Sequence, residues 1–457
     1  MQYHSLKTNS VKASFADALL ASLAPDGGLW MPDSLPNFTP EQTAQMGAMS
    51  FADCAAKLAR YFVDDSFSDD DLRALCRDAY DFPMPLVEST GRVMDSATPE
   101  IASDYFLELF HGPTLAFKDF AARFMGRAAS HLMGKSGETR TILVATSGDT
   151  GGAIGDAFLG QDGINVFILY PKGGVSKVQE QQLTTMGKKG CNIHAICVDG
   201  TFDDCQALVK AAFADQALSV KHHLMSANSI NVGRVIPQSF YYFWSSLQIK
   251  AAHPGKRIVY SIPSGNLGNL TGGLIARKMG APIERFVIGH NVNDPFVDYL
   301  KTGEYTPRPS QPTLSNAMDI GRPNNFPRIV DLFGGDFDAL SAVCWGASFT
   351  DDETERYMRR YHARTGYVMC PHTTVGQLAM DAFGNAFADD VETDFIKVTV
   401  ATAHPAKFAD SVERILREDV PLPEPLAKAF RKKPRVHVMT PELSSLADYL
   451  SVTLDPK

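Results

Sequence analysis

The sequence predicts an α/β protein that has a mostly helical N-terminal segment. Beyond about residue 139, continuous apolar runs alternate with segments that have the residue spacing of helices. Continuous apolar strands separated by helices indicate a parallel sheet that is covered on both faces. The chain has 457 residues, of which 44% are hydrophobic and 21% charged, and a chain of this length is expected to form two or three domains.

Helical spacing dominates residues 1–95, which we expect to form an N-terminal segment or domain. Helices are predicted at 15–24, 55–63 and 71–80, and the first of them ends at the turn sequence APDGG. The rest of this segment is expected to form loops.

The remaining chain is predicted to form one α/β domain over residues 96–250 and a larger one over 251–457. Each apolar strand run is followed by a helical pattern, as expected for parallel strands joined by helices. Strands are predicted at 139–147, 164–171, 192–200, 257–263, 285–291 and 394–402, and helices at 151–160, 177–187, 201–215, 270–280 and 406–416.

Charge and hydropathy exclude two classes of partner. The formal net charge is −9, which argues against nucleic-acid binding by the protein as a whole but allows a small local site for an anion. No run of eighteen apolar residues is present, and the N-terminal sequence MQYHSLKTNS lacks an apolar signal core. We therefore expect a cytoplasmic protein that does not bind membranes.

The seven cysteines predict a reducing compartment and no metal site. None of them forms a CxxC pair, and the three at positions 191, 197 and 205 lack the spacing of zinc ligands. Buried free thiols are the ordinary interpretation of such a set.

Lys118 stands in apolar surroundings. Read at helical spacing from Thr114, it shares a face with small and apolar residues such as Met125, whereas Asp119 and Arg127 lie on another stripe, where a solvated lysine would be expected. Burial and a helix N-terminus both lower a lysine pKa, and the neutral amine can attack an aldehyde. The alternative is a lysine that extends to solvent or pairs with Asp119.

Two glycine-rich turns follow predicted strands, at the strand ends where parallel sheets bind ligands. Residues 145–155, ATSGDTGGAIG, combine small residues with hydroxyl groups and a following helix, which suits a carboxylate or phosphate. Residues 263–273, PSGNLGNLTGG, form a longer candidate anion cradle, but they match neither a P-loop nor a dinucleotide fingerprint. Either turn could instead serve only strand–helix packing.

Thr402, in the segment ATAHPAKF, follows the last predicted strand. Its hydroxyl would lie in the same crevice as the two turns, although a helix-capping role is an equal alternative. A buried lysine together with a separate phosphate cradle suggests pyridoxal 5′-phosphate, which offers an aldehyde to the amine and a phosphate to the glycines.

Six motifs in one order resemble the threonine synthase family, in its longer bacterial and fungal-type branch. They are HGPTLAFKD, TSGDTGG, SANSINVGR, PSGNLGN, TLSNAMD and TAHPAKF, and the N-terminal FADALLASLAPDGGLWMP also resembles that branch. The resemblance extends from about residue 14 to residue 415. It implies the fold type II architecture of pyridoxal phosphate enzymes, in which two α/β domains enclose a cofactor crevice.

The resemblance also implies residue roles at the cofactor. Lys118 matches the lysine that forms the Schiff base, and Thr402 matches the hydroxyl residue that faces the pyridine nitrogen. The phosphate loop would consist of Gly265, Asn266, Leu267, Gly268 and Asn269. The family often has Phe and Asp where this chain has Leu267 and Asn269, which leaves the role of Asn269 open.

For the substrate, the resemblance implies two groups of residues. Ser147, Gly148, Asp149 and Thr150 match the loop that holds the substrate carboxylate; related enzymes often have Asn at Asp149, so this contact would depend on protonation. The family's binding site for the substrate phosphate is matched by Asn228, Ser229, Asn231 and Arg234. The alternative is a helix-capping cluster of polar residues. Lys172 and Lys177 could add positive charge there.

The implied reaction converts O-phospho-L-homoserine and water to L-threonine and phosphate, with Lys118 moving the protons. One alternative is another pyridoxal phosphate lyase or dehydratase that acts on a phosphorylated amino acid. A second is a binding protein that keeps the fold without catalysis. The sequence leaves the choice between monomer and dimer open.

Overall fold

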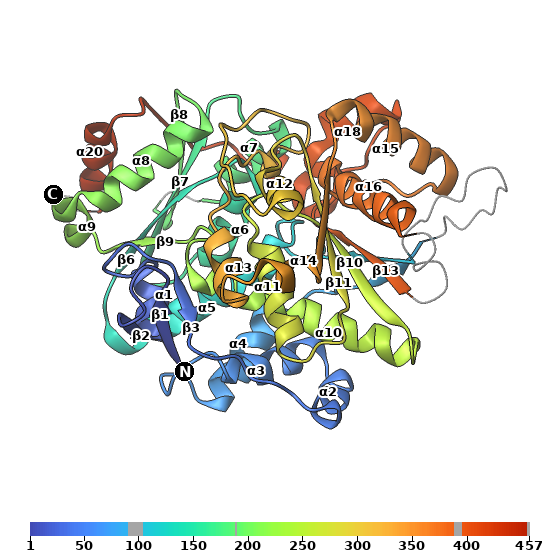
Figure 1. The fold of residues 1–457 in the computed structure, drawn as a ribbon. Coiled ribbons are helices and arrows are strands. Elements are labelled where there is room, and N and C mark those ends of the chain that lie inside the picture. The colour runs from blue at the N-terminus through green and yellow to red at the C-terminus, as the bar shows by residue number, and fades with distance from the viewer. Residues whose placement is uncertain (90–103, 188–189, 388–394, 455–457) are drawn as a thin grey trace.

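The computed structural model describes residues 1–89, 104–187, 190–387 and 395–454. Two large sheets lie side by side in Figure 1, with β6 to β9 on the left, β10 to β13 on the right, and α6 and α11 between them. A small sheet and several helices of the N-terminal segment lie below both.

The first large sheet has the strand order β14-β8-β7-β6-β9, and all its neighbouring strands are parallel. Its strands are β6 (Arg140–Ala145), β7 (Ile164–Pro171), β8 (Ile193–Val198), β9 (Leu224–Ser226) and β14 (His437–Met439). The helices around it are α5 (Lys118–Ser136), α6 (Asp149–Phe158), α7 (Lys177–Thr185), α8 (Phe202–Ala214), α9 (Gln216–Lys221) and α20 (Leu443–Leu454).

The second large sheet has the order β12-β11-β10-β13-β5-β4, parallel except for the β4–β5 pair. Its strands are β4 (Leu86–Glu88), β5 (Tyr105–Glu108), β10 (Arg257–Pro263), β11 (Arg285–His290), β12 (Cys344–Ser348) and β13 (Phe395–Ala401). Its helices include α10 (Pro237–Ala252), α11 (Gly268–Lys278), α15 (Asp351–Thr365) and α16 (Pro371–Ala386). Shorter helices are α12 (Pro295–Thr302), α13 (Phe326–Leu332), α14 (Phe337–Ser341), α18 (Ala409–Leu416) and α19 (Glu424–Phe430).

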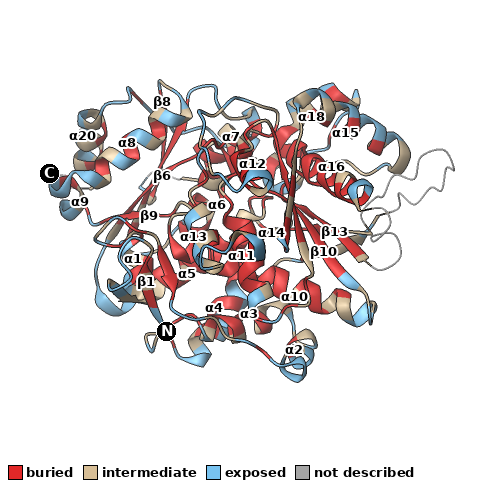
Figure 2. Ribbon diagram, in the orientation of Figure 1, coloured by how far each residue is buried: buried red, intermediate tan, exposed pale blue. Residues whose placement is uncertain are grey.

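Both large sheets are buried on both faces, as the continuous apolar runs predict. Along β6, Ile142 packs in the cluster of α5 and α6, whereas the next residue, Leu143, packs in the cluster of α8 and α20. Along β10, Ile258 packs in the cluster that contains α10 and α11, whereas Val259 packs in the cluster that contains α16. Figure 2 shows the strands as buried ribbon inside helices whose outer faces are exposed.

The N-terminal segment is helical, as predicted, but it also contains a three-stranded antiparallel sheet that was not expected. Its helices are α1 (Phe15–Ala21), α2 (Pro40–Gly47), α3 (Phe51–Arg60) and α4 (Asp69–Ala79), and its strands are β1 (Gln2–Ser5), β2 (Lys12–Ser14) and β3 (Trp30–Pro32). Strands of three or four residues are too short to leave a clear alternation in the sequence.

The two large sheets exchange strands across the predicted division at residue 250. β5 precedes Lys118 in the chain but pairs with β13, and β14 near the C-terminus pairs with β8. Local sequence patterns cannot reveal such long-range pairing. The predicted domain boundaries therefore stay a prediction. The boundary between residues 95 and 96 lies outside the described residues. In the described part of the chain, no helix is long and apolar enough to cross a membrane.

Candidate active site

One cavity of about 270 Å³ lies where the carboxyl ends of parallel strands from both sheets meet. Its walls come from the segments that follow β5, β6, β9, β10 and β13, together with α8, residues 317–324 and the start of α16. The predicted residues that line it are Lys118, Ser147, Asp149, Thr150, Asn228, Ser229, Arg234, Gly265, Asn266, Gly268, Asn269 and Thr402. Gly148, Asn231 and Leu267 are absent from this lining.

Lys118 is the first residue of α5, so the helix starts later than the spacing from Thr114 predicts. Leu115 has a φ of 60°, a left-handed conformation that a helix cannot contain. In the described part of the chain, Lys118 Nζ makes no hydrogen bond or ion pair. Burial lowers the pKa of Lys118 to about 8, against the opposing charge of Asp149. About a tenth of the Lys118 side chains are therefore neutral at pH 7, far more than for an unperturbed lysine.

The charged stripe beside Lys118 also contains Arg123 and is more buried than helical spacing predicts, although Arg127 stays partly exposed. Asp119 is fully buried and accepts hydrogen bonds from the N–H and hydroxyl of Thr114. Arg123 is also buried and donates to Ala79 O at 2.7 Å. Burial raises the pKa of Asp119 to about 7, against those hydrogen bonds. The alternative of a Lys118–Asp119 pair finds no support in these contacts.

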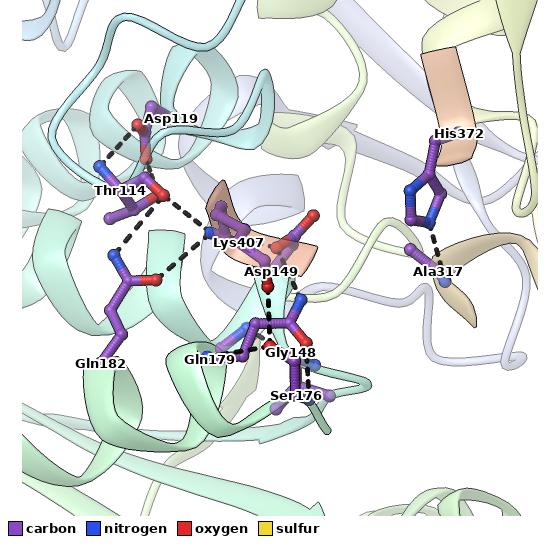
Figure 3. Close-up of polar contacts among 12 residues, drawn as sticks. Thr114, Asp119, Gly148, Asp149, Ser176, Gln179, Gln182, Ala317, His372 and Lys407 are labelled. Carbon is purple, nitrogen blue, oxygen red and sulfur yellow. Dashed lines mark hydrogen bonds and ion pairs between the residues drawn. The ribbon is translucent and has the colours of Figure 1, made fainter. Parts of the chain in front are cut away.

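Asp149, the first residue of α6, pairs instead with Lys407, as Figure 3 shows. The Lys407 Nζ–Asp149 Oδ1 distance is 3.0 Å, and both side chains are buried. Lys407 Nζ also donates to Thr114 O at 2.7 Å and to Gln182 Oε1 at 3.2 Å. Its three N–H groups therefore have three acceptors, so Lys407 is held as a structural ammonium group.

This pair fixes the charge of Asp149. Burial alone would raise the pKa of Asp149, but Lys407 and Lys118 and a hydrogen bond from Gln179 hold it well below its usual range. Asp149 is therefore ionised at neutral pH and accepts hydrogen bonds. It cannot donate one, unlike the asparagine often found at this position in related enzymes.

The loop between β10 and α11 presents backbone N–H groups. Within the described residues, those of Gly265 to Asn269 have no acceptor. The side chain of Asn269 closes the loop itself: it accepts from the Ser264 hydroxyl at 2.6 Å and donates to Pro263 O at 2.9 Å. A Cβ at Gly265 would lie 2.8 Å from Met318 Cα, so only glycine fits there. Such a row of free donors suits a phosphate.

Gly148 and Leu267 do not line the cavity, but each has a positive φ that shapes the backbone of its loop. Gly148 has a φ of 125°, and a Cβ there would lie 2.3 Å from Gln179 Cδ. Leu267 has a φ of 60° just before α11. A bulky residue in the left-handed region is strained, and such strain collects at binding sites.

The segment after β9 supplies an arginine that has no carboxylate partner among the described residues. Arg234 is buried; its Nη1 donates to Ala227 O, and its buried Nε has no acceptor within the described residues. Burial lowers the pKa of Arg234 to about 10, which leaves it positively charged at neutral pH. Ser229 also lines the cavity, and its Cβ would lie 3.6 Å from a Cβ placed at Gly268, beside the loop after β10.

Asn231, in contrast, belongs to the framework. Its side-chain amide donates to Leu19 O, Ser22 Oγ and Ser226 O, and its oxygen accepts from Gly233 N. These bonds tie the segment to α1 and leave nothing for a ligand. For this residue the capping alternative describes the contacts better than the phosphate interpretation.

Neither surface lysine of YPKGGVSK reaches the cavity. The Lys172 side chain is 62% exposed and pairs with Asp199 at 3.3 Å. Lys177 begins α7 and is absent from the cavity lining.

Sequence reasoning missed two residues of the site, His372 and Lys407. His372 lines the cavity from the first turn of α16. Lys407 lies in the motif TAHPAKF, but it stands in a short 3-10 turn, Pro405–Phe408, where no helical face indicates burial. Only the converging strand ends bring these two residues beside Lys118.

The donor set fits pyridoxal phosphate. Lys118 is partly buried and has no ion-pair partner within the described residues, so its amine can react with the aldehyde, and the N–H groups of the loop after β10 can bind the phosphate. The Thr402 N–H donates to Thr373 Oγ1 at 3.3 Å, which holds this threonine in the lining.

Comparisons with known proteins agree along the whole chain. The profile "Threonine synthase N terminus" matches residues 2–80, "Pyridoxal-phosphate dependent enzyme" matches 97–393, and "Threonine synthase, C-terminal" matches 378–450. A threonine synthase of Escherichia coli is 40% identical over 94% of both chains.

Solved structures agree in fold. The pyridoxal phosphate-bound threonine synthase of Brucella melitensis has a TM-score of 0.88 at 34% identity and covers 99% of both chains. The yeast threonine synthase has a TM-score of 0.88 at 30% identity and covers 100% of this chain and 99% of its own. The architecture is that of fold type II, as expected, and the cofactor is pyridoxal 5′-phosphate. The chain belongs to the threonine synthase family of pyridoxal phosphate-dependent enzymes.

Proposed function

We propose that the protein converts O-phospho-L-homoserine and water to L-threonine and phosphate in the cytoplasm. One observation carries this proposal beyond family membership. The cavity combines a partly buried lysine with a separate anion site around Arg234, and neither side chain has an ion-pair partner within the described residues. A substrate with both an amino group and a phosphate uses both features.

The substrate carboxylate would bind at the start of α6. The backbone N–H groups of Ser147, Asp149 and Thr150 have no acceptor within the described residues, and the positive end of the helix dipole lies there. The ionised side chain of Asp149 is partnered by Lys407, so this part of the site carries little net charge.

The substrate phosphate would bind at Arg234, with Asn228 and Ser229 as further donors. Arg234 is already desolvated and has no carboxylate partner within the described residues, so its guanidinium loses little on binding a phosphate dianion. The cofactor phosphate would bind the N–H groups of Gly265 to Asn269.

When bound, pyridoxal phosphate supplies an electron sink for the carbon next to the substrate amine. Lys118 would then act as the base and acid, since its lowered pKa lets it accept and release a proton near neutral pH. Within the described residues, Asp149, Arg234 and His372 are the other titratable side chains of the lining near Lys118. None suits proton transfer near neutral pH, because Asp149 stays ionised, Arg234 stays protonated and His372 holds a fixed tautomer.

The test is an assay of both products. Purified holoprotein is incubated with O-phospho-L-homoserine, and phosphate and L-threonine are quantified together. Equal amounts of the two support the proposal. Phosphate together with a keto acid would instead establish the alternative, a lyase that eliminates phosphate without forming threonine.

Arg234→Gln tests the phosphate site. We expect KM for O-phospho-L-homoserine to rise roughly 10- to 100-fold with a smaller effect on kcat, because a hydrogen bond between charged groups contributes about 1.5–3 kcal/mol. Steady-state kinetics on Arg234→Gln and on the control Lys172→Gln measures this. An unchanged KM would remove Arg234 from the substrate site.

A further inference from the structure

We propose that His372 is a further binding residue of this cavity: a neutral imidazole that donates a hydrogen bond from Nδ1 to an anionic oxygen of the bound cofactor or to the carboxylate of the bound amino acid. The inference rests on the proposed function, because it places that cofactor and substrate in the cavity.

The tautomer of His372 follows from one contact. Its Nε2 lies 3.1 Å from the backbone nitrogen of Ala317. A backbone N–H can only donate, so Nε2 must be the acceptor and carries no proton. In a neutral ring the proton is then on Nδ1, and an imidazolium ion is incompatible with this contact.

The protonated nitrogen has no hydrogen-bond acceptor in the part of the chain that the structure describes. Within the described residues, His372 Nδ1 is a buried atom without a hydrogen-bond partner, on a side chain that is only 4% exposed and lines the cavity. In Figure 3 this nitrogen faces the side of the ring on which Asp149 and Lys407 lie, away from Ala317. Buried donors are rarely left unsatisfied, so an acceptor is expected from the molecule that fills the cavity.

The surroundings keep the ring neutral and favour a negatively charged acceptor. Burial lowers the pKa of His372 to about 4, with Asp149 opposing this shift and Lys118 and Lys407 adding to it. His372 stands in the first turn of the sixteen-residue helix α16, where the helix dipole also disfavours a positive ring and favours an anionic ligand. At neutral pH the side chain is therefore a donor and no proton carrier.

Both the cofactor and the amino-acid substrate carry anionic oxygens, so either could accept the hydrogen bond from Nδ1.

Two amide substitutions test the contributions of the two ring nitrogens separately. In His372→Gln the longer side chain places an oxygen near the position of Nε2, which can still accept from Ala317, but the donor at Nδ1 is lost. In His372→Asn the shorter side chain places an amide near Nδ1, which keeps the donor and loses the contact with Ala317.

The experiment measures binding in two arms. In the first, apoprotein is titrated with pyridoxal phosphate and binding is followed by protein fluorescence. In the second, holoprotein is titrated with L-threonine and followed by cofactor absorbance. We expect His372→Gln to raise Kd about tenfold in one arm and His372→Asn to stay within about twofold of the wild type, as for the loss of one hydrogen bond.

The arm that weakens identifies which molecule carries the oxygen. Equal weakening in both variants would mean that His372 acts only by supporting Ala317, and it would overturn the proposal. Unchanged binding in both variants would overturn it as well. Circular dichroism and thermal denaturation confirm that each variant folds. The cofactor arm does not depend on threonine formation, so a failed product assay and a failed His372 proposal are distinguishable.

Discussion

At the residue scale, the buried Lys407 and the partly buried Lys118 differ in their partners. Lys407 has acceptors for all three N–H groups, including the carboxylate of Asp149. Lys118 has no hydrogen bond or ion pair within the described residues, and its pKa falls to about 8. The same side chain thus serves as a fixed charge at one position and as a reactive amine at the other.

Lys407→Met should destabilise the protein by about 3–5 kcal/mol, because it leaves the buried carboxylate of Asp149 without its partner. The double variant Asp149→Asn with Lys407→Met should recover most of this loss, since no charge remains uncompensated. Urea denaturation measures both. The exposed Lys172–Asp199 pair is the control: Lys172→Met should cost less than about 1 kcal/mol. A Lys407→Met variant as stable as this control would contradict the role of the pair.

Lys118 should show its lowered pKa in chemical labelling. In apoprotein treated with formaldehyde and cyanoborohydride, its methylation rate should rise about tenfold per pH unit below pH 8 and level off above it, because only the neutral amine reacts. The methylation rate of free lysine, whose side-chain pKa is about 10.4, should keep rising beyond pH 9. Peptide mass spectrometry follows the rate. In Asp149→Asn the plateau should begin at lower pH, since Asp149 raises this pKa; a rate that tracks free lysine would contradict the assignment.

At the scale of elements, the sequence predicts well where a strand is long, apolar and buried on both faces. All six predicted strands are present, and β7 and β10 have the predicted bounds. The three strands of the N-terminal sheet were missed because each has only three or four residues. The start of α5 was placed too early because the conformation of Leu115 leaves no mark in the periodicity.

The contact between α5 and α6 depends on a glycine. A Cβ at Gly126 would lie 2.6 Å from the carbonyl oxygen of Ala157, so Gly126→Ala must push the two helices apart and should cost about 1–3 kcal/mol. Gly134 in the same helix has no atom within 4 Å of such a Cβ, and Gly134→Ala should stabilise by up to about 1 kcal/mol. Thermal denaturation compares the two. Equal effects would contradict the close packing at Gly126.

At the scale of the whole molecule, the site exists because strand ends from both sheets converge. The sequence predicted that ligand-binding segments follow strand ends, and most of the proposed residues line one cavity. The pairing of β5 with β13, which brings Lys118 to that cavity, depends on contacts between residues about 290 positions apart. The contacts of Asn231 with α1 and the places of His372 and Lys407 could not be predicted from the sequence, because hydrogen-bond partners are visible only in three dimensions; the phosphate role of Asn231 stays a prediction.

The most direct measurement identifies the lysine that carries the cofactor. Holoprotein is reduced with borohydride, which fixes pyridoxal phosphate to the lysine that holds it, and the peptides are mapped by mass spectrometry. We predict the added mass on the peptide that contains Lys118, none on the peptide that contains Lys407, and none in a folded Lys118→Ala variant. The added mass on Lys407, or its persistence in Lys118→Ala, would contradict the central role of Lys118.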